Sequence, residues 1–341
     1  MYINGIGILG RFGRGVDTLK KQLENFSLNS EILNEEYHVG CELLKDKILS
    51  KKLRRADRYT KMAVLAGNDC LNDNEILNSG KKIDLSKTGV ILATAFGPHN
   101  TTFSFLDDIL EYGEDSVSAI KFSHSVHNAA ASYIALLLKI TGPTLTVTQI
   151  KFPIQHALIL AANWLNDDTC DNVLVCCVDE KGELYDEVAR KKLNLKKNGN
   201  ISPFSFSKNA KAIPSEGSVC FLLQKDSIKS ESYCEVSRTS FDSIKNINTD
   251  LCIFGADGIP EDETEYAKLQ NMKIPIEAYT PLYGSMIIGS AFDCVVGALS
   301  LKNRKVYSAN PSNNSFSSIS SIGCYKLDCD DNSATILLNS V

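Results

Sequence analysis

The stretch FSHSVHNAAASYIALLLKITGPTLTV, residues 122–147, decides the fold class of this chain. Small and apolar side chains dominate residues 128–138 (NAAASYIALLL), and this composition predicts a helix. A glycine–proline turn then leads into residues 145–150 (LTVTQI), where β-branched side chains predict a strand. A helix, a turn and a strand in direct succession are typical of an α/β architecture.

The same alternation continues on both sides of this stretch. Short apolar runs predict further strands at residues 2–8, 89–94, 173–178, 218–223, 251–254 and 334–338. Apolar residues at helical spacing predict helices at residues 57–71, 102–110, 154–165 and 290–301. The strand VLVCCV at 173–178 and the helix at 290–301 carry almost no polar side chains, so both are expected to be buried.

A weak internal repeat indicates two related halves. In the first half, the helix at 154–165 precedes the strand at 173–178, and in the second half the helix at 290–301 precedes residues 305–309. The polar stretch 179–211 separates them. Its lysines are offset by acidic residues, so it is expected to be a solvated loop and not a nucleic-acid-binding patch.

The composition excludes several classes of protein. The chain has 341 residues, 36 Lys and Arg against 41 Asp and Glu, and a formal net charge of −5. This mild acidity argues against nucleic-acid binding, which needs a basic face. No apolar run reaches the roughly 18–20 residues that cross a bilayer, and the amino terminus lacks a signal-peptide pattern. We therefore expect a cytoplasmic protein that binds neither nucleic acid nor membrane.

The cysteines predict buried thiols and no disulfide framework. The count is eleven, an odd number, and no CxxC pair occurs, so a structural zinc site is not expected. Cys176 and Cys177 are adjacent within one predicted strand and should face opposite sides of it. Cys220, Cys252 and Cys294 also lie in apolar stretches, where a reduced cysteine acts as a small hydrophobic residue.

Six segments, taken in order, resemble the β-ketoacyl synthases of the thiolase fold over essentially the whole chain. They are YINGIGILGRFGRGVDTLKKQL (2–23), RRADRYTKMAVLAGNDCL (54–71), GVILATAFGP (89–98), the opening stretch 122–147, PSEGSVCFLL (214–223) and GSMIIGSAFDCVVGALSL (284–301). The resemblance implies two related βαβαβαββ halves in a five-layered α-β-α-β-α arrangement. It assigns residues 1–185 to the first half, with the nucleophile position and the dimer interface, and residues 186–341 to the second.

The chemistry of that family requires groups that this sequence lacks. The position of the nucleophilic cysteine, counted from the Gly-Pro turn, falls on Lys151. The two histidine positions fall on Phe254 and Ser285, and all five histidines of the chain lie in its first half. The glycine-rich closing loop is matched by residues 326–333, KLDCDDNS, which contain no glycine. The resemblance therefore implies no catalytic residues, no metal and no cofactor.

The resemblance is closest to the chain-length factor of type II polyketide synthases, a ketosynthase-like subunit that has lost its nucleophile. It implies that this chain alone does not catalyse condensation. Its partners would be an active β-ketoacyl synthase, in a heterodimer or heterotetramer, and an acyl carrier protein. The chain would shape the tunnel that sets the length of a polyketide, polyene or fatty acyl chain. Tunnel residues in the matching helix are Thr102, Phe103, Leu106 and Ile109, with ordinary core packing as the alternative role.

The dimer interface implied by the resemblance includes the opening stretch. Its candidate residues are His124, His127, Asn128, Thr146 and Val147. The two histidines are spaced HxxH, but no further ligand cluster follows, so a packing role is expected and not a metal site.

Two alternative functions remain open at this stage. One is a repurposed thiolase-fold enzyme that uses Lys151, by imine formation, or His156. The other is a homodimeric acyl-binding or scaffold protein. Lys151 could equally extend to solvent or pair with a carboxylate and fill a disused pocket.

Overall fold

The computed structural model describes most of the chain. The described residues are 1–26, 37–183, 186–187, 201, 203–204, 212–228, 231–241, 249–259, 266–267, 274–308, 319–328 and 332–341. The expected loop at 179–211 lies largely outside them. Within them, no helix has the length and apolar character needed to cross a bilayer.

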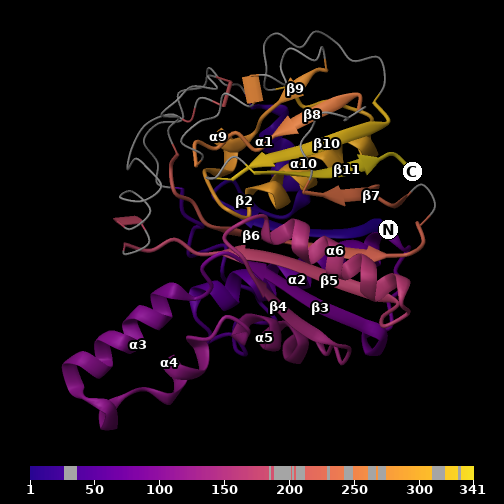
Figure 1. Cartoon of the computed structure of the whole chain (residues 1–341). Coiled ribbons are helices and arrows are strands. Elements are labelled where there is room, and N and C mark those ends of the chain that lie inside the picture. Colours follow the sequence, from indigo (N-terminus) through magenta and orange to yellow (C-terminus); the bar gives the residue numbers. More distant parts are fainter. Residues whose placement is uncertain are drawn as a thin grey trace.

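The described strands form one 11-stranded sheet, in the order β4-β3-β5-β6-β1-β7-β11-β10-β8-β9, with β2 paired to β1 (Figure 1). The bounds are β1 Tyr2–Gly10, β2 Gly13–Arg14, β3 Thr88–Thr94, β4 Thr144–Thr148, β5 Asn172–Asp179, β6 Gly217–Gln224, β7 Cys234–Ser240, β8 Leu251–Phe254, β9 Ile276–Glu277, β10 Ser321–Leu327 and β11 Ser333–Asn339.

The strand order shows two halves of the same topology. From its outer edge to the middle of the sheet, the first half runs β4, β3, β5, β6, β1, and the second runs β9, β8, β10, β11, β7. The short strand β2 is left out of this comparison. Counted along the chain, each half then has five strands, and both halves place them in the order third, second, fourth, fifth, first. The directions also agree, because β3 is parallel to β4 and β5, and β8 is parallel to β9 and β10. The topology agrees with the expectation of two related halves. The strand repeat changes halves between β6 and β7, so β6, at Gly217–Gln224, belongs to the first half by this topology, although it lies beyond the expected boundary at residue 185.

The helices are α1 Val16–Glu24, α2 Arg58–Leu77, α3 His99–Tyr112, α4 Ala119–His124, α5 Ala129–Leu138, α6 Pro153–Asn166, α9 Thr280–Tyr283 and α10 Gly289–Asn303, with 3-10 turns at Leu85–Lys87 and Glu114–Ser116. One core joins α6 and α10 to strands of both halves, and a second joins α2 and α5 to the other face of the first half. A third, on the outer face of the second half, includes Tyr266, whose chain neighbours lie mostly outside the described residues.

Successive side chains of a strand point to opposite faces of the sheet, so one sheet contributes to two cores. Cys177 belongs to the core between the halves and Cys176 to the core under α2, as their adjacency predicts. The strand β5 and residues Gly289 to Leu301 of α10 are buried throughout, again as expected. Among the described cysteines none is paired, and all except Cys41 are buried.

Close packing between β1 and α2 depends on glycine. A Cβ atom at Gly7 would lie 1.9 Å from the carbonyl oxygen of Ala66 on α2. No side chain fits at that distance, so a residue without Cβ is required where the helix crosses the strand. The start of α2 is fixed by Asp57, which accepts a hydrogen bond from the Thr60 amide at 2.8 Å.

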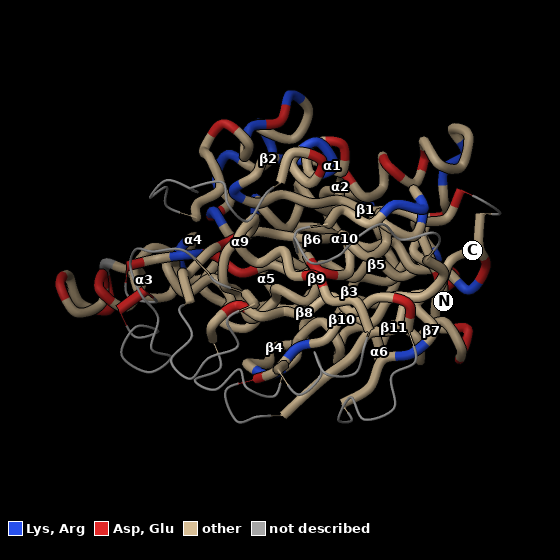
Figure 2. The backbone as a smooth tube through the Cα atoms, turned by 90° about the horizontal axis from the view of Figure 1, so that it is seen from above, with Lys and Arg blue, Asp and Glu red and all other residues tan. Residues whose placement is uncertain are grey.

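Helices α3 and α4 form an arm that projects from the body of the molecule (Figure 1). The arm is held together by an ion pair between Lys121 and Asp108, with Nζ 2.7 Å from Oδ2, and by the rings of Phe105 and Phe122, whose centres are 5.5 Å apart. Large apolar side chains are exposed along it, and acidic residues lie at its outer end (Figure 2).

The second half differs from the internal repeat that the sequence analysis described. That repeat set residues 305–309 against the strand of the first half, but residues 305–308 form no strand, and the strand that follows α10 is β10, at Ser321–Leu327. The strands β7 and β10 escaped notice because Glu235, Arg238 and Lys326 interrupt their apolar residues. Both are nevertheless held by ladders to neighbouring strands, and such pairing is not visible in local sequence.

Candidate functional site

The carboxyl ends of parallel strands from both halves meet at one place. Lys151 follows β4 of the first half, and Asp328 follows β10 of the second. In open α/β sheets ligands commonly bind outside the carboxyl ends of parallel strands. This junction is therefore the natural candidate site, and it contains the expected nucleophile position.

The turn between β4 and α6, where the resemblance predicts the nucleophile position, is sharp. Phe152 is buried and adopts the left-handed conformation, with φ 54° and ψ 48°, directly before Pro153 at the start of α6. Such a conformation is costly for a residue with a Cβ and persists only where the surroundings enforce it. Lys151 precedes this sharp turn, and its Nζ lies 3.4 Å from Oδ2 of Asp328.

The Lys151 side chain is only partly buried, with 43% exposed, whereas that of Asp328 is 5% exposed. Of the alternatives for Lys151, the pairing with a carboxylate is the one observed. The partner residue comes from the segment that matches the glycine-rich closing loop. Residues 329–331 of that segment lie outside the described residues.

The pocket at this junction is nearly full. Its cavity measures about 10 Å³ and is lined by Ile150, Phe152, Ile259, Ile287, Lys326, Leu327 and Asp328. Between the described residues that line it, the space is about the size of one water molecule, which is too small for an acyl thioester.

A second lysine–aspartate pair lies behind the first. The ammonium group of Lys326 pairs with Asp257 and also donates to the carbonyl oxygen of Gly255 at 3.0 Å. Both side chains are buried, at 7% and 3% exposed. Burial raises the pKa of Asp257, and the charge of Lys326 only partly offsets it.

The residues at the two expected histidine positions, Phe254 and Ser285, lie in different surroundings. Phe254 is buried in an aromatic cluster, with its ring centre 5.0 Å from that of Tyr266 and 5.9 Å from that of Tyr325, and it does not line the pocket. Ser285 lies two residues before Ile287, which lines the pocket, but the Ser285 hydroxyl hydrogen-bonds to backbone groups. It donates to the Asp257 carbonyl at 2.6 Å and accepts from the Ile213 amide at 2.9 Å. Neither group is arranged to stabilise an oxyanion.

Two buried carboxylates hold the end of β5 to the end of β3. Asp179 accepts hydrogen bonds from the Thr94 hydroxyl at 2.7 Å and the Ala95 amide at 3.0 Å. Glu180 accepts from the Asn100 amide at 3.0 Å, which anchors the start of the arm. Burial raises the pKa of Asp179 to about 6 and that of Glu180 to about 8, despite these bonds.

Glu216, in the segment PSEGSVCFLL, is a buried carboxylate that binds three segments of the first half. Its carboxylate pairs with Arg58 at the start of α2, with Nε 3.0 Å from Oε2. It also accepts from the Val39 amide at 2.8 Å and the Lys181 amide at 3.1 Å. Burial alone would raise the pKa of Glu216, but hydrogen bonds from His38 and Arg58 outweigh it and lower the pKa to about 2.

The expected tunnel residues lie on α3, in the projecting arm, and none of them lines the filled pocket. Phe103 and Leu106 are exposed, at 40% and 44%, and Ile109 is half-buried. The Thr102 hydroxyl lies 2.9 Å from the Ser125 carbonyl oxygen, which ties α3 to the end of α4. Ordinary core packing does not describe Phe103 and Leu106, because both face solvent in the isolated chain.

The expected interface residues lie around α5 and β4. His124 is buried, and its Nε2 lies 3.1 Å from the Tyr133 hydroxyl, so it joins α4 to α5. His127 and Asn128 are exposed at the start of α5, and Thr146 and Val147 are half-buried on β4. In the described sheet β4 is an edge strand that pairs only with β3.

His156 is placed for packing. Its ring centre lies 4.6 Å from that of Phe241, and burial lowers its pKa. Among the described residues there is no group of three or more His, Cys, Asp or Glu side chains arranged to hold a metal ion.

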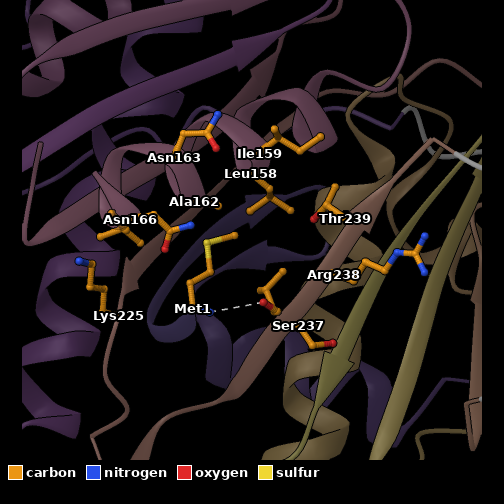
Figure 3. Close-up of a pocket in the computed structure, with 12 residues that line it drawn as sticks. Met1, Leu158, Ile159, Ala162, Asn163, Asn166, Lys225, Ser237, Arg238 and Thr239 are labelled. Carbon is orange, nitrogen blue, oxygen red and sulfur yellow. Dashed lines mark hydrogen bonds between the residues drawn. The ribbon is translucent and has the colours of Figure 1, made fainter. Parts of the chain in front are cut away.

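A larger cavity, of about 470 Å³, lies between the carboxyl-terminal part of α6 and β7 (Figure 3). Asn163 and Asn166 line it from α6 and Thr239 from β7, and Met1 extends into it. The Met1 amino group donates to the Val236 carbonyl at 3.5 Å. None of the expected site residues lines this cavity.

Residues 46–195 match the family model described as the beta-ketoacyl synthase N-terminal domain. The whole chain also aligns with a solved structure of a type II PKS acyl-carrier protein in complex with its ketosynthase bound to the hexaketide. The TM-score is 0.76 at 14% identity, covering 100% of this chain and 99% of that one. The fold is that of the thiolase-like ketosynthases.

Two further ketosynthase-fold structures align with this chain over 100% of its length, and each alignment covers 99% of the solved chain. The ishigamide ketosynthase/chain length factor aligns with a TM-score of 0.72 at 16% identity. A beta-ketoacyl synthase from Burkholderia phymatum STM815 aligns with a TM-score of 0.76 at 12% identity. No curated protein sequence matches this ketosynthase-like chain.

The sequence analysis did not identify the charged side chains at and behind the pocket. Lys326 and Asp328 line the pocket, and Asp257 pairs with Lys326. Their signal was a charge within an otherwise apolar run, which predicts a buried partner of opposite sign.

Proposed function

We propose that this chain is a non-catalytic, ketosynthase-like subunit of the chain-length-factor kind. In this proposal it pairs with an active β-ketoacyl synthase, and the pair extends an acyl chain delivered by an acyl carrier protein. The thioester bond is made and broken on the partner. This chain contributes one wall of the tunnel and so limits the length of the product.

The filled elbow pocket carries the proposal. The position that requires a nucleophile holds Lys151, its amine is engaged by Asp328, and the cavity beside it is about 10 Å³. A condensing enzyme needs a thiolate, an oxyanion site and room for two acyl groups. The fold of a condensing enzyme is retained, but the pocket beside the nucleophile position is filled. This combination favours a structural subunit over a catalyst.

The surface of the chain supports a partner. The outer edge of β4 is unpaired within the described sheet, and Leu145 on it is 41% exposed. The arm exposes Phe103, Leu106 and Phe122 nearby in sequence. An open strand edge and exposed apolar side chains are both surfaces that a stable subunit interface covers.

The alternative of an imine-forming lysine is less well supported. Such a lysine works as a nucleophile when it is desolvated and its amine is neutral. Lys151 is 43% exposed and its Nζ lies 3.4 Å from a carboxylate oxygen of Asp328, so the amine is not desolvated.

The first test is isolation of the native complex, followed by native mass spectrometry. A one-to-one assembly with a ketosynthase that retains its cysteine is expected. A homodimer free of any such partner would contradict the proposal and favour the scaffold alternative. Condensation of malonyl and acyl thioesters by the purified chain alone would contradict it as well.

The second test concerns product length in the reconstituted complex. Truncation of Phe103 or Leu106 to alanine should lengthen the product, because each removes a bulky side chain from the arm. Leu110→Ala is a matched control, since Leu110 is on the same helix but 85% exposed. An unchanged product distribution in both test variants would remove the arm from the proposed tunnel wall.

A further inference from the structure

A groove with an apolar floor lies on the outer surface of the first half, away from the elbow pocket. It runs between residues 48–52, α2, the connection to β3 and the end of α5, and its volume is about 440 Å³. Its floor consists of Leu49, Leu71, Ile83, Leu85, Leu137 and Leu138. Ile48 stands at its margin and is 82% exposed. The remaining lining residues are polar, namely Lys52, Asn68, Asn72, Asn74, Glu75, Lys82 and Lys139. A cavity of this size with an apolar floor and a few polar groups around it is typical of sites for small organic ligands.

The rim of this groove carries an excess of positive charge. Lys52, Lys82 and Lys139 line it, against the single carboxylate of Glu75. Lys82 and Glu75 neutralise each other, with Nζ 3.6 Å from Oε2. Within the described part of the chain, Lys52 and Lys139 have no ion-pair partner, so two cations remain beside an apolar floor in a protein of net charge −5.

From this juxtaposition we infer that the groove binds a long-chain carboxylate, with the alkyl chain on the leucine-rich floor and the carboxylate between Lys52 and Lys139. An alkyl chain supplies the apolar surface that the floor requires, and each methylene removed from water adds to affinity. A carboxylate head supplies the charge that the rim lacks. This inference does not rest on the proposed subunit function, because the groove and the elbow pocket share no residues.

The test is calorimetric titration of the purified full chain with octanoate, decanoate, dodecanoate and tetradecanoate, each below its micelle concentration. Affinity should rise by up to about fourfold for each added methylene and then level off once the groove is full. A continued rise without a plateau would indicate unspecific partition and overturn the inference. Absence of binding by every member of the series would overturn it too.

The role of the rim is tested with a double variant and a neutral ligand. Lys52→Gln combined with Lys139→Gln should weaken dodecanoate binding about fivefold and leave methyl dodecanoate unaffected. Lys81→Gln is the matched control, because Lys81 is exposed on the same connection but does not line the groove. Equal affinity of the wild-type chain for the carboxylate and its ester would overturn the assignment of the head group.

The role of the floor is tested by filling the groove. Asn72 lines it from the exposed side of α2, so Asn72→Trp can occupy the cavity without changing the core. Dodecanoate binding should fall at least tenfold, with the thermal unfolding temperature unchanged. Binding that persists undiminished in this variant would overturn the location of the site.

Discussion

At the scale of single residues, the candidate site is defined by two lysine–aspartate pairs of unequal burial. Lys151 and Asp328 meet at the surface of the pocket, whereas Lys326 and Asp257 are enclosed. A half-exposed pair is screened by water and contributes little to stability. A buried pair is different, because loss of one member leaves a charge without compensation in a medium of low polarity.

The same substitution at the two lysines should therefore have unequal effects. Lys326→Met is expected to lower the free energy of unfolding by about 3 kcal/mol, because Asp257 is left buried without its counter-ion. Lys151→Met should lower it by less, because Lys151 is 43% exposed and the buried carboxylate of Asp328 keeps two hydrogen bonds from Asn332, each 2.9 Å long. Urea denaturation followed by circular dichroism measures both. Equal losses in the two variants would show that burial does not separate the pairs.

Glu180 makes stability depend on pH. Its pKa is raised by burial from 4.5 to about 8, so the folded chain holds this proton more tightly than the unfolded chain. The associated stability is complete below pH 4.5 and is lost as pH rises through about 8. The slope that Glu180 contributes is at most about 1.4 kcal/mol per pH unit.

Glu180→Gln imitates the protonated side chain and keeps an acceptor for the Asn100 amide. The variant should gain stability relative to the wild-type chain as pH increases from 5 to 8, the interval in which Glu180 ionises. Thermal unfolding at a series of pH values measures the difference. A constant difference across this range would contradict the raised pKa.

At the scale of elements, β4 is the edge strand of the first half, as β9 is of the second. Gln149 donates its amide to Thr94 on β3 at 3.1 Å, and amides alternate in direction along a strand. The amide of Thr148 therefore points away from β3, towards any strand that a partner adds.

Thr148→Pro removes that outward amide from an exposed position. The variant should fold but lose subunit association, since proline cannot donate to an added strand. Thr148→Ala keeps the amide and is the control. Size-exclusion chromatography with light scattering distinguishes the two results, and full association of the proline variant would argue against strand pairing at this edge.

The contact between β1 and α2 is a second feature of this scale. Gly7→Ala sets a Cβ 1.9 Å from a backbone oxygen, so strand and helix must separate. We expect a loss of about 3 kcal/mol or more in unfolding free energy. Gly289→Ala is the comparison, because a Cβ there has no neighbour within 4 Å, and it should be neutral or slightly stabilising. Comparable losses at both positions would contradict this account of the packing.

At the scale of the whole molecule, the elbow pocket is assembled from both halves of the sheet. Ile150 and Phe152 come from the first half, and Ile259, Ile287 and Asp328 from the second. Condensation would need a nucleophile from one half, electrophilic groups from the other, and space between them. Restoring any one of these leaves the others absent.

Lys151→Cys is therefore expected to remain inactive. The introduced thiol would stand at the elbow, but the cavity of about 10 Å³ has no room for an acyl group. Incubation with malonyl and acyl thioesters, followed by mass spectrometry, measures both acylation of the cysteine and condensation. Product formation above that of the wild-type chain would show that a nucleophile was the only missing component.

Much of the fold followed from local sequence alone. Apolar runs located β5 and β8 closely, and the apolar periodicity located α6 and α10, because an element buried on several faces leaves a continuous signal. The sequence also shows which residues stand at the counted nucleophile and histidine positions, namely Lys151, Phe254 and Ser285.

Only the tertiary structure decided how those positions meet. The Lys151 and Asp328 pair joins residues that are far apart in the chain, and the same holds for Lys326 and Asp257. The sequence by itself determined the alternation of strands and helices in two related α/β halves, and the residues at the counted site positions. That Lys151 and Lys326 meet carboxylates from distant parts of the chain, and that α3 stands away from the body, depends on strand pairing and burial between the halves, which no local pattern encodes.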